Sequence, residues 1–218
     1  MQLRWCQSSS VDGELLDLVP SKIVGIGQNY RAHAAEMGKG LPEEPLVFLK
    51  PRSALIGDGT PIVRPPGYER VDYEGELGVV IGRRARRVDA RDALTYVMGF
   101  TCINDVTVRD LQKKDGQWTR AKGFDTFCPL GPRIVGGLDP SDLAITTRVN
   151  GAVRQQSSTS DLIFDVPTLI AFVSAHMTLE PGDVISTGTP AGVGNLAVGD
   201  TVEVEIAGIG SLRTPEIA

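Results

Sequence analysis

The sequence contains few of the residues that mark several common classes of protein. Histidine occurs only twice in 218 residues, and the cysteines stand at three well-separated positions without a CxxC pair (Cys6, Cys102 and Cys128). An odd number of cysteines at such spacing argues against a disulfide framework or a cysteine-bound metal and favours reduced thiols. No apolar run is long enough to span a membrane. The first residues also lack the apolar centre of a secretory signal. We therefore expect a cytoplasmic protein without a membrane partner.

The chain also lacks an excess of basic residues. Lys and Arg number 22 against 27 Asp and Glu, which gives a net charge of −5. The densest basic run, residues 83–87, is followed by Asp89 and Asp92, as expected for a solvated turn. A general positive field that would attract nucleic acid is absent from this composition, so no nucleic-acid partner is expected.

Aromatic residues are scarce at 6%, whereas glycine (25) and proline (14) are plentiful, a balance that favours short strands and many turns. Residues 143–156 alternate around Asn150-Gly151, which predicts a hairpin with a two-residue turn. Residues 167–179 form the one pattern typical of a longer helix. Repeats and linkers are absent. The sequence thus predicts a β-rich α+β fold with few short helices and one longer helix, preceded by a short lead-in over residues 1–21.

The segment YEGELGVVIG contains a pair of carboxylates in a predicted strand over residues 73–81. The period of two places Glu74 and Glu76 on one face and the apolar Leu77 and Val79 on the other. Two neighbouring carboxylates repel each other unless a positive group neutralises them. A solvated acidic edge strand is the alternative, and for the pair taken alone it is the favoured interpretation.

Asp105 follows a second apolar strand, where the pattern predicts the start of a short helix. With Asp105 as the N-cap, Arg109 at i+4 and Gln112 at i+7 would share its helix face. The alternative is that Asp105 only caps the helix and pairs with Arg109. Three carboxylates without histidine or cysteine suit a hard cation, Mg²⁺, Mn²⁺ or Ca²⁺, better than zinc.

Four segments, in this order, resemble the fumarylacetoacetate hydrolase family: YEGELGVVIG, GFTCINDVTVRDLQ, QWTRAKGFDTFCPLGP and TGTPAGVG. The resemblance extends across residues 22–212. It implies a mixed β-sandwich roll, a single catalytic domain over residues 22–218 and a homodimer. It also implies that Glu74, Glu76 and Asp105 bind Mg²⁺ or Mn²⁺.

The resemblance assigns roles to further residues. Lys122, in TRAKGFD, corresponds to a lysine that neutralises charge on the substrate, although a surface lysine is the ordinary alternative. Arg109 and Gln112 are expected to face the substrate. Thr189 lies in a glycine-rich loop that lacks the Gly-Lys-Ser/Thr ending of a phosphate loop, and is expected to bind a substrate carboxylate.

His33 and Glu36 stand at i and i+3 in NYRAHAAEMG, so their side chains can meet on a short helix. The segment resembles the lid of the family, where such a pair activates water; an exposed surface pair is the alternative. The sequence also resembles shorter members of the family, because only about twenty residues precede KIVGIG.

The resemblance implies a metal-dependent enzyme acting on a small 2-oxo acid. The dyad of His33 and Glu36 favours hydrolysis of a C–C bond in an acylpyruvate. Decarboxylation of oxaloacetate and keto–enol tautomerisation, or isomerisation of 2-hydroxyhepta-2,4-diene-1,7-dioate, pass through the same enolate and remain open. A non-catalytic module that binds a cation or carboxylate would need only the three acids.

Overall fold

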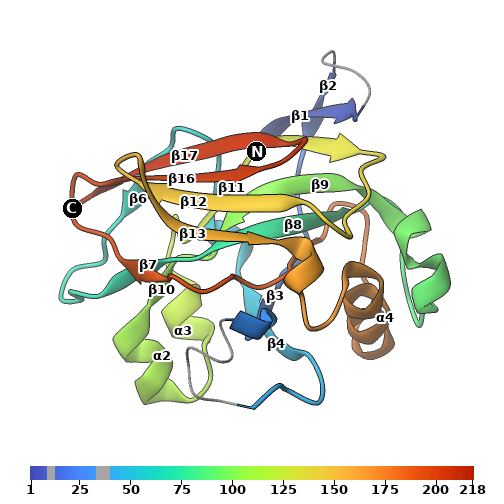
Figure 1. Ribbon diagram of the computed structural model, residues 1–218, viewed down its shortest axis with the longest axis horizontal. Coiled ribbons are helices and arrows are strands. Elements are labelled where there is room, and N and C mark those ends of the chain that lie inside the picture. Colours follow the sequence, from blue (N-terminus) through green and yellow to red (C-terminus); the bar gives the residue numbers. More distant parts are fainter. Residues whose placement is uncertain (9–12, 33–39) are drawn as a thin grey trace.

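The computed structural model describes residues 1–8, 13–32 and 40–218, and these form three sheets with few helices (Figure 1). The largest sheet has the order β2-β1-β11-β9-β8-β14-β3-β4, with β5 paired to β11. Its strands are β1 (Gln2–Gln7), β2 (Glu14–Asp17), β3 (Ile23–Gly27), β4 (Leu46–Lys50), β5 (Leu55–Ile56), β8 (Gly75–Ile81), β9 (Val97–Asn104), β11 (Cys128–Gly136) and β14 (Val184–Ser186). This β-rich architecture confirms the predicted fold class.

A second sheet of the described chain has the order β13-β12-β16-β17-β6 and lies across the large one (Figure 1). Its strands are β6 (Ile62–Val63), β12 (Ala144–Val149), β13 (Ala152–Ser158), β16 (Thr201–Ile206) and β17 (Gly210–Ile217). The predicted hairpin is the pair β12–β13, and Asn150 and Gly151 both have positive φ angles, 51° and 81°. Such angles are typical of the type I′ turn that Asn-Gly favours.

The core follows the period-two pattern of β8. Leu77, Val79 and Ile81 join the apolar cluster that contains residues of the second sheet and of the helix α4 (Val166–His176). Val80, on the opposite face of β8, belongs to the other core cluster, with Leu130 of β11. Both faces of β8 are therefore covered, and all seven of its residues are buried. The solvated acidic edge strand is excluded.

Among the described residues the helices are short except for α4, which confirms the one longer helix. Asp165 caps α4, accepting a hydrogen bond from the backbone N–H of Thr168 at 2.9 Å. The others are η1 (Arg52–Ala54), η2 (Ala90–Tyr96), α2 (Arg109–Asp115), α3 (Thr119–Lys122) and η3 (Thr159–Asp161). No helix among the described residues is both long and apolar enough to cross a lipid bilayer.

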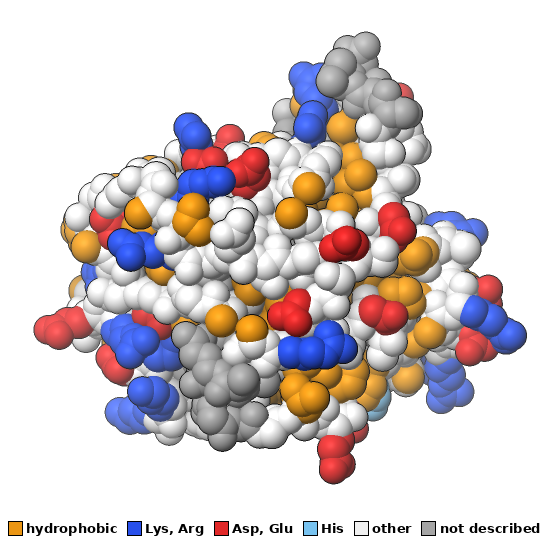
Figure 2. Space-filling model, in the orientation of Figure 1, with side chains coloured by type: hydrophobic (Ala, Val, Ile, Leu, Met, Phe, Trp, Pro, Cys, Tyr) orange, Lys and Arg blue, Asp and Glu red, His pale blue; other side chains and the backbone are white. Residues whose placement is uncertain are grey.

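Two helices and a small sheet lie together on one side of the molecule. The small sheet has the order β10-β7-β15, formed by β7 (Val71–Tyr73), β10 (Thr107–Val108) and β15 (Gly194–Asn195). The helices α2 and α3 follow β10 and lie next to it, and α3 also packs against β4 (Figure 1). On the face of the molecule in Figure 2, Lys and Arg side chains are interspersed with Asp and Glu. The charged groups that matter for chemistry are the buried ones beside α2 and α3.

Candidate metal centre and active site

Three carboxylates converge where β8 and β9 meet. Glu74 stands in the break between β7 and β8, Glu76 is the second residue of β8, and Asp105 follows β9. The antiparallel register pairs Glu76 with Ile103, and the backbone N–H of Asp105 donates to the carbonyl of Glu74 at 2.8 Å. One oxygen from each carboxylate lies within 4.8 Å of the others, and all three residues are buried. The structure thus brings the predicted triad together.

Two of the carboxylates are paired with buried cations. Lys122 Nζ lies 2.7 Å from Glu74 Oε2 and 2.5 Å from Asp105 Oδ2. Arg109 Nη2 lies 2.6 Å from the other oxygen of Glu74, and Lys50 Nζ lies 2.5 Å from the other oxygen of Asp105. Burial alone would raise the pKa of Glu74, but the charges of Lys122 and Arg109 lower that pKa to about 2.

Glu76 lacks a cation among its described hydrogen-bond partners. Its Oε2 accepts hydrogen bonds from Ser186 Oγ at 2.5 Å and from the backbone N–H of Gly188 at 2.8 Å. Burial, followed by the negative charges of Asp105 and Glu74, raises the pKa of Glu76 well above its ordinary value. A divalent cation between the three carboxylates would remove this repulsion. An all-oxygen donor set of this kind suits Mg²⁺ or Mn²⁺, so the residues fit a hard divalent cation.

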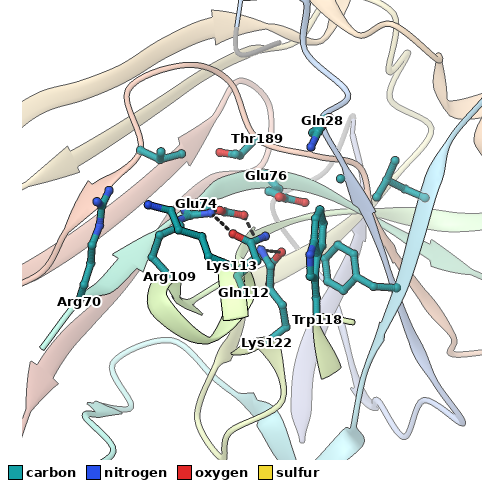
Figure 3. A pocket seen from close by; sticks show the side chains of 15 residues that line it. Gln28, Arg70, Glu74, Glu76, Arg109, Gln112, Lys113, Trp118, Lys122 and Thr189 are labelled. Carbon is teal, nitrogen blue, oxygen red and sulfur yellow. Dashed lines mark hydrogen bonds and ion pairs between the residues drawn. The ribbon is translucent and has the colours of Figure 1, made fainter. Parts of the chain in front are cut away.

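The triad lies at the base of a cavity of about 310 Å³ (Figure 3). Phe48 and Trp118 form one wall, with ring centroids 5.4 Å apart. The ammonium of Lys122 lies 5.0 Å from the Phe48 centroid and 6.0 Å from that of Trp118, within reach of a cation–π attraction. Burial lowers the pKa of Lys122, but the charges of Asp105 and Glu74 outweigh it and raise that pKa above the ordinary value. Lys122 is therefore a fixed positive charge, and the surface alternative for it is wrong.

Arg109 and Gln112 also line the cavity, but the predicted position of the helix was wrong. Asp105 does not cap α2, because β10 intervenes and the residue before the helix is Val108. Arg109 pairs with Asp72 and Glu74 rather than with Asp105. Its Nη1 donates to Gln112 Oε1 at 2.6 Å, so the two side chains brace each other beside Glu74.

Thr189 lines the same cavity from the loop after β14. Its hydroxyl donates to the carbonyl of Gly75 at 2.9 Å and accepts from Gln155 Nε2 at 2.8 Å. Gln155 also accepts the N–H of Gly75 at 3.0 Å and donates to the carbonyl of Pro190 at 2.8 Å. Gln155 thereby links Gly75, the glycine between the two glutamates, to the loop that contains Thr189. No pattern in the sequence predicted this role of Gln155.

Lys50 and Asp72 are buried charged residues that the sequence analysis missed, and it did not single out Arg70 and Lys113, which line the cavity. Lys50 is the last residue of β4, is 1% exposed, and shares its strand face with Phe48. Asp72, in β7, holds Arg109 Nε at 2.9 Å. The only available signal was a lysine at the end of the apolar run LVFLK, which gives no hint of its partner. His33 and Glu36 lie outside the described residues.

Comparisons with known proteins place the chain in a family. The model of the fumarylacetoacetate (FAA) hydrolase C-terminal domain matches residues 22–215. Oxaloacetate tautomerase YisK of Bacillus subtilis is 47% identical over 210 residues, which cover 88% of this chain and 69% of that protein.

Two solved structures share the fold. One, a 5-carboxymethyl-2-hydroxymuconate delta-isomerase from Mycobacterium smegmatis, is 50% identical with a TM-score of 0.88, over 94% of this chain and 86% of that one. The other is a fumarylpyruvate hydrolase from Pseudomonas aeruginosa in complex with Mn²⁺ and pyruvate. It is 29% identical with a TM-score of 0.88, and the match covers 99% of this chain and 96% of that one. These matches confirm the resemblance seen in the sequence: the chain belongs to the fumarylacetoacetate hydrolase family of enzymes.

Proposed function

We propose that the protein is a divalent-metal-dependent enzyme that forms the enolate of a small 2-oxo acid, and that keto–enol tautomerisation of oxaloacetate is its reaction. The observation that carries the proposal is the buried triad of Glu74, Glu76 and Asp105 with the ammonium of Lys122 fixed beside it. Bound to the triad, Mg²⁺ or Mn²⁺ would act as a Lewis acid that polarises the 2-oxo group and stabilises the enolate charge.

Lys122 supplies the second positive charge of the site. Its ammonium is held in place by Glu74 and Asp105, at 2.7 and 2.5 Å, and it remains protonated because both partners are anionic. A preorganised donor of this kind stabilises an oxyanion without reorganisation during the reaction. Lys122 is therefore assigned to the developing enolate oxygen and not to proton abstraction.

Other residues of the cavity bind and enclose the substrate in this proposal. Arg109 and Gln112 are braced against each other at 2.6 Å, and Thr189 is fixed by Gln155 on the loop after β14. The rings of Phe48 and Trp118 exclude water from one wall, which strengthens the electrostatic interactions inside the cavity.

Relatives named for both activities are similar to this chain, and those named for tautomerisation or isomerisation are somewhat more similar. The tautomerase of B. subtilis and the isomerase of M. smegmatis are 47% and 50% identical to it, whereas a fumarylacetoacetate hydrolase of Exiguobacterium antarcticum is 43% identical and the fumarylpyruvate hydrolase is 29% identical. Hydrolysis of an acylpyruvate is the second candidate. The sequence pair His33 and Glu36 favours it slightly, since activation of water for attack on a carbonyl needs a general base; the proton transfer of tautomerisation needs a base as well.

A panel of substrates distinguishes these reactions. The purified protein with Mg²⁺ or Mn²⁺ is incubated with enol-oxaloacetate, oxaloacetate, acetylpyruvate and fumarylpyruvate, with chelator and Lys122→Met as controls. Acceleration of enol-oxaloacetate conversion to the keto form, lost in both controls, supports the tautomerase. Release of a carboxylic acid from an acylpyruvate would show that the protein is a hydrolase instead. Release of carbon dioxide from oxaloacetate would show that it is a decarboxylase. Inertness toward all four, with metal bound, would refute enolate chemistry on these acids.

A further inference from the structure

The Asn150-Gly151 turn joins β12 to β13 at the edge of the second sheet, and both of its residues are exposed. The chain has four asparagines, at positions 29, 104, 150 and 195, and Asn150 is the one that precedes a glycine. A side-chain amide is lost most readily in this sequence, because glycine has no Cβ to obstruct the approach of its backbone nitrogen. We propose that Asn150 is a site of spontaneous deamidation, and that Asp200 and Thr201 hold its amide in an unreactive orientation in the folded protein.

The modification requires water and no other reactant. The backbone nitrogen of Gly151 forms a bond to Cγ of Asn150 while the Cγ–Nδ2 bond breaks. The proton of the Gly151 N–H passes to solvent, and Nδ2 takes a proton from water and leaves as ammonia. One water molecule then opens the cyclic imide at either of its two carbonyl groups. The product is aspartate, or isoaspartate when the main chain continues through the former side chain.

The folded turn occupies both ends of the Asn150 amide. Its Nδ2 donates to Asp200 Oδ1 at 2.7 Å, and its Oδ1 accepts the backbone N–H of Thr201 at 2.9 Å. The backbone N–H of Asn150 donates to the carbonyl of Thr201 at 2.9 Å, so main chain and side chain are held by the same segment. The bond to Asp200 is charge-assisted and therefore one of the stronger kind.

Asp200 is itself fixed before it meets Asn150. Its Oδ2 accepts the backbone N–H of Ala197 at 2.8 Å, and its own N–H donates to the carbonyl of Ala197 at 2.9 Å. To bring Cγ of Asn150 to the nitrogen of Gly151, the side chain must rotate and leave both of its partners. The reaction therefore proceeds from a locally opened turn, and its rate reports how often the turn opens.

Deamidation would also break the contact that prevents it. Aspartate at position 150 places a carboxylate oxygen where Nδ2 now meets Asp200 Oδ1, so two like charges face each other. Isoaspartate adds one carbon to the main chain of a two-residue turn, whose length sets the register of the hairpin. The strand that follows, β13, carries Gln155, which bonds Gly75 and Thr189. The modified turn would thus adjoin the strand that supports the metal centre.

Peptide mapping by mass spectrometry tests the proposal on the full chain at mildly alkaline pH, by the mass change of amide to acid. Conversion is followed in the folded wild type, in the wild type unfolded in guanidinium chloride, and in folded Asp200→Ala. Asp139→Ala is the matched control, because Asp139 also holds a turn, through the N–H of Ser141 at 3.0 Å. Asn195, exposed but followed by leucine, is an internal control in every sample. Circular dichroism verifies that both variants are folded.

Asn150 is expected to convert in the unfolded wild type and at least about 10-fold more slowly in the folded wild type. Asp200→Ala is expected to convert about 5-fold faster than the folded wild type, and Asp139→Ala at the wild-type rate. Absence of conversion at Asn150 in the unfolded chain overturns the modification site. Equal rates in folded and unfolded wild type, or in Asp200→Ala and folded wild type, overturn the protective contact.

A pair of variants tests the effect of the product without waiting for the reaction. Asn150→Asp is expected to unfold at a lower guanidinium concentration than the wild type, because its carboxylate faces that of Asp200. Adding Asp200→Asn to this variant should restore part of the stability, since an amide donor again meets a carboxylate. Equal stability of Asn150→Asp and the wild type, or a further loss in the double variant, contradicts the inferred repulsion.

Discussion

Replacement of Lys50 by methionine tests whether the triad is held by buried counter-charges. Lys50 is fully buried; its ammonium lies 2.5 Å from Asp105 Oδ1 and 3.3 Å from the carbonyl of Val106. Methionine has a similar length and fills the same space with an apolar chain. The substitution therefore removes a charge while causing little loss of packing.

The expected cost follows from the partners that remain. Removal of one member of a buried ion pair costs about 3–5 kcal/mol, because the other charge is left uncompensated. Asp105 keeps Lys122 at 2.5 Å on its second oxygen, so the lower end, about 3 kcal/mol, is expected for Lys50→Met without metal. In a chain of this size, that corresponds to a fall in melting temperature of about 6–12 °C.

A divalent cation should repair much of this loss. Without Lys50 the cluster is more negative, so Mg²⁺ binds the folded variant more favourably and stabilises it more than the wild type. Urea unfolding with chelator and with Mg²⁺ measures both differences. Lys22→Met is the matched control: it breaks a lysine–aspartate pair at Asp183, away from the triad, and Mg²⁺ should not reduce its deficit. A loss below about 1 kcal/mol for Lys50→Met, or a deficit that Mg²⁺ leaves unchanged, would refute the reasoning.

Three further changes test separate contacts by urea unfolding. Glu76→Gln should stabilise the metal-free protein by about 1–2 kcal/mol, because the raised pKa of Glu76 indicates that its negative charge is disfavoured in the fold. A variant that is less stable than the wild type in the presence of chelator would contradict this. In Gly75→Ala the new methyl carbon would lie 2.1 Å from Thr147 Oγ1, so a loss of about 2–4 kcal/mol is expected, and addition of Thr147→Ala should restore part of it. Burial alone would raise the pKa of Asp183, but hydrogen bonds from the backbone N–H of Glu180 and from Lys22 leave that pKa below its ordinary value. The stability that Asp183 contributes is therefore present above a pH of about 4 and is lost as the pH falls further. Asp183→Asn should be less stable than the wild type by about 1–2 kcal/mol at pH 7 and equally stable in acid.

The sequence predicted the parts of the site that depend on local pattern. Alternation in YEGELGVVIG placed Glu74 and Glu76 on one strand face, and the apolar run before Asp105 predicted the neighbouring strand. The motifs of the family linked these segments to Lys122. The start of α2 was wrong by three residues, because the two residues of β10 pair with β7, a contact between distant segments that no local pattern signals.

The counter-charges and supporting hydrogen bonds of the site could not be predicted for the same reason. Lys50, Asp72 and Gln155 lie on three different strands, and each acts on the site through a partner at least 34 residues away. A lysine at the end of an apolar strand is ordinarily exposed. Only the packing of β4 beside α3 shows that Lys50 is buried and paired with Asp105.

Binding of Mn²⁺ to the metal-free protein tests the central claim most directly. Titration calorimetry is run on the wild type, on Glu76→Gln and on Glu69→Gln, which removes an exposed carboxylate outside the triad. The account predicts one Mn²⁺ per chain for the wild type and Glu69→Gln, and affinity weakened by at least about 100-fold in Glu76→Gln, since a neutral amide oxygen replaces an anionic ligand of a hard cation. Equal affinity of all three proteins would contradict the assignment of the metal to the triad.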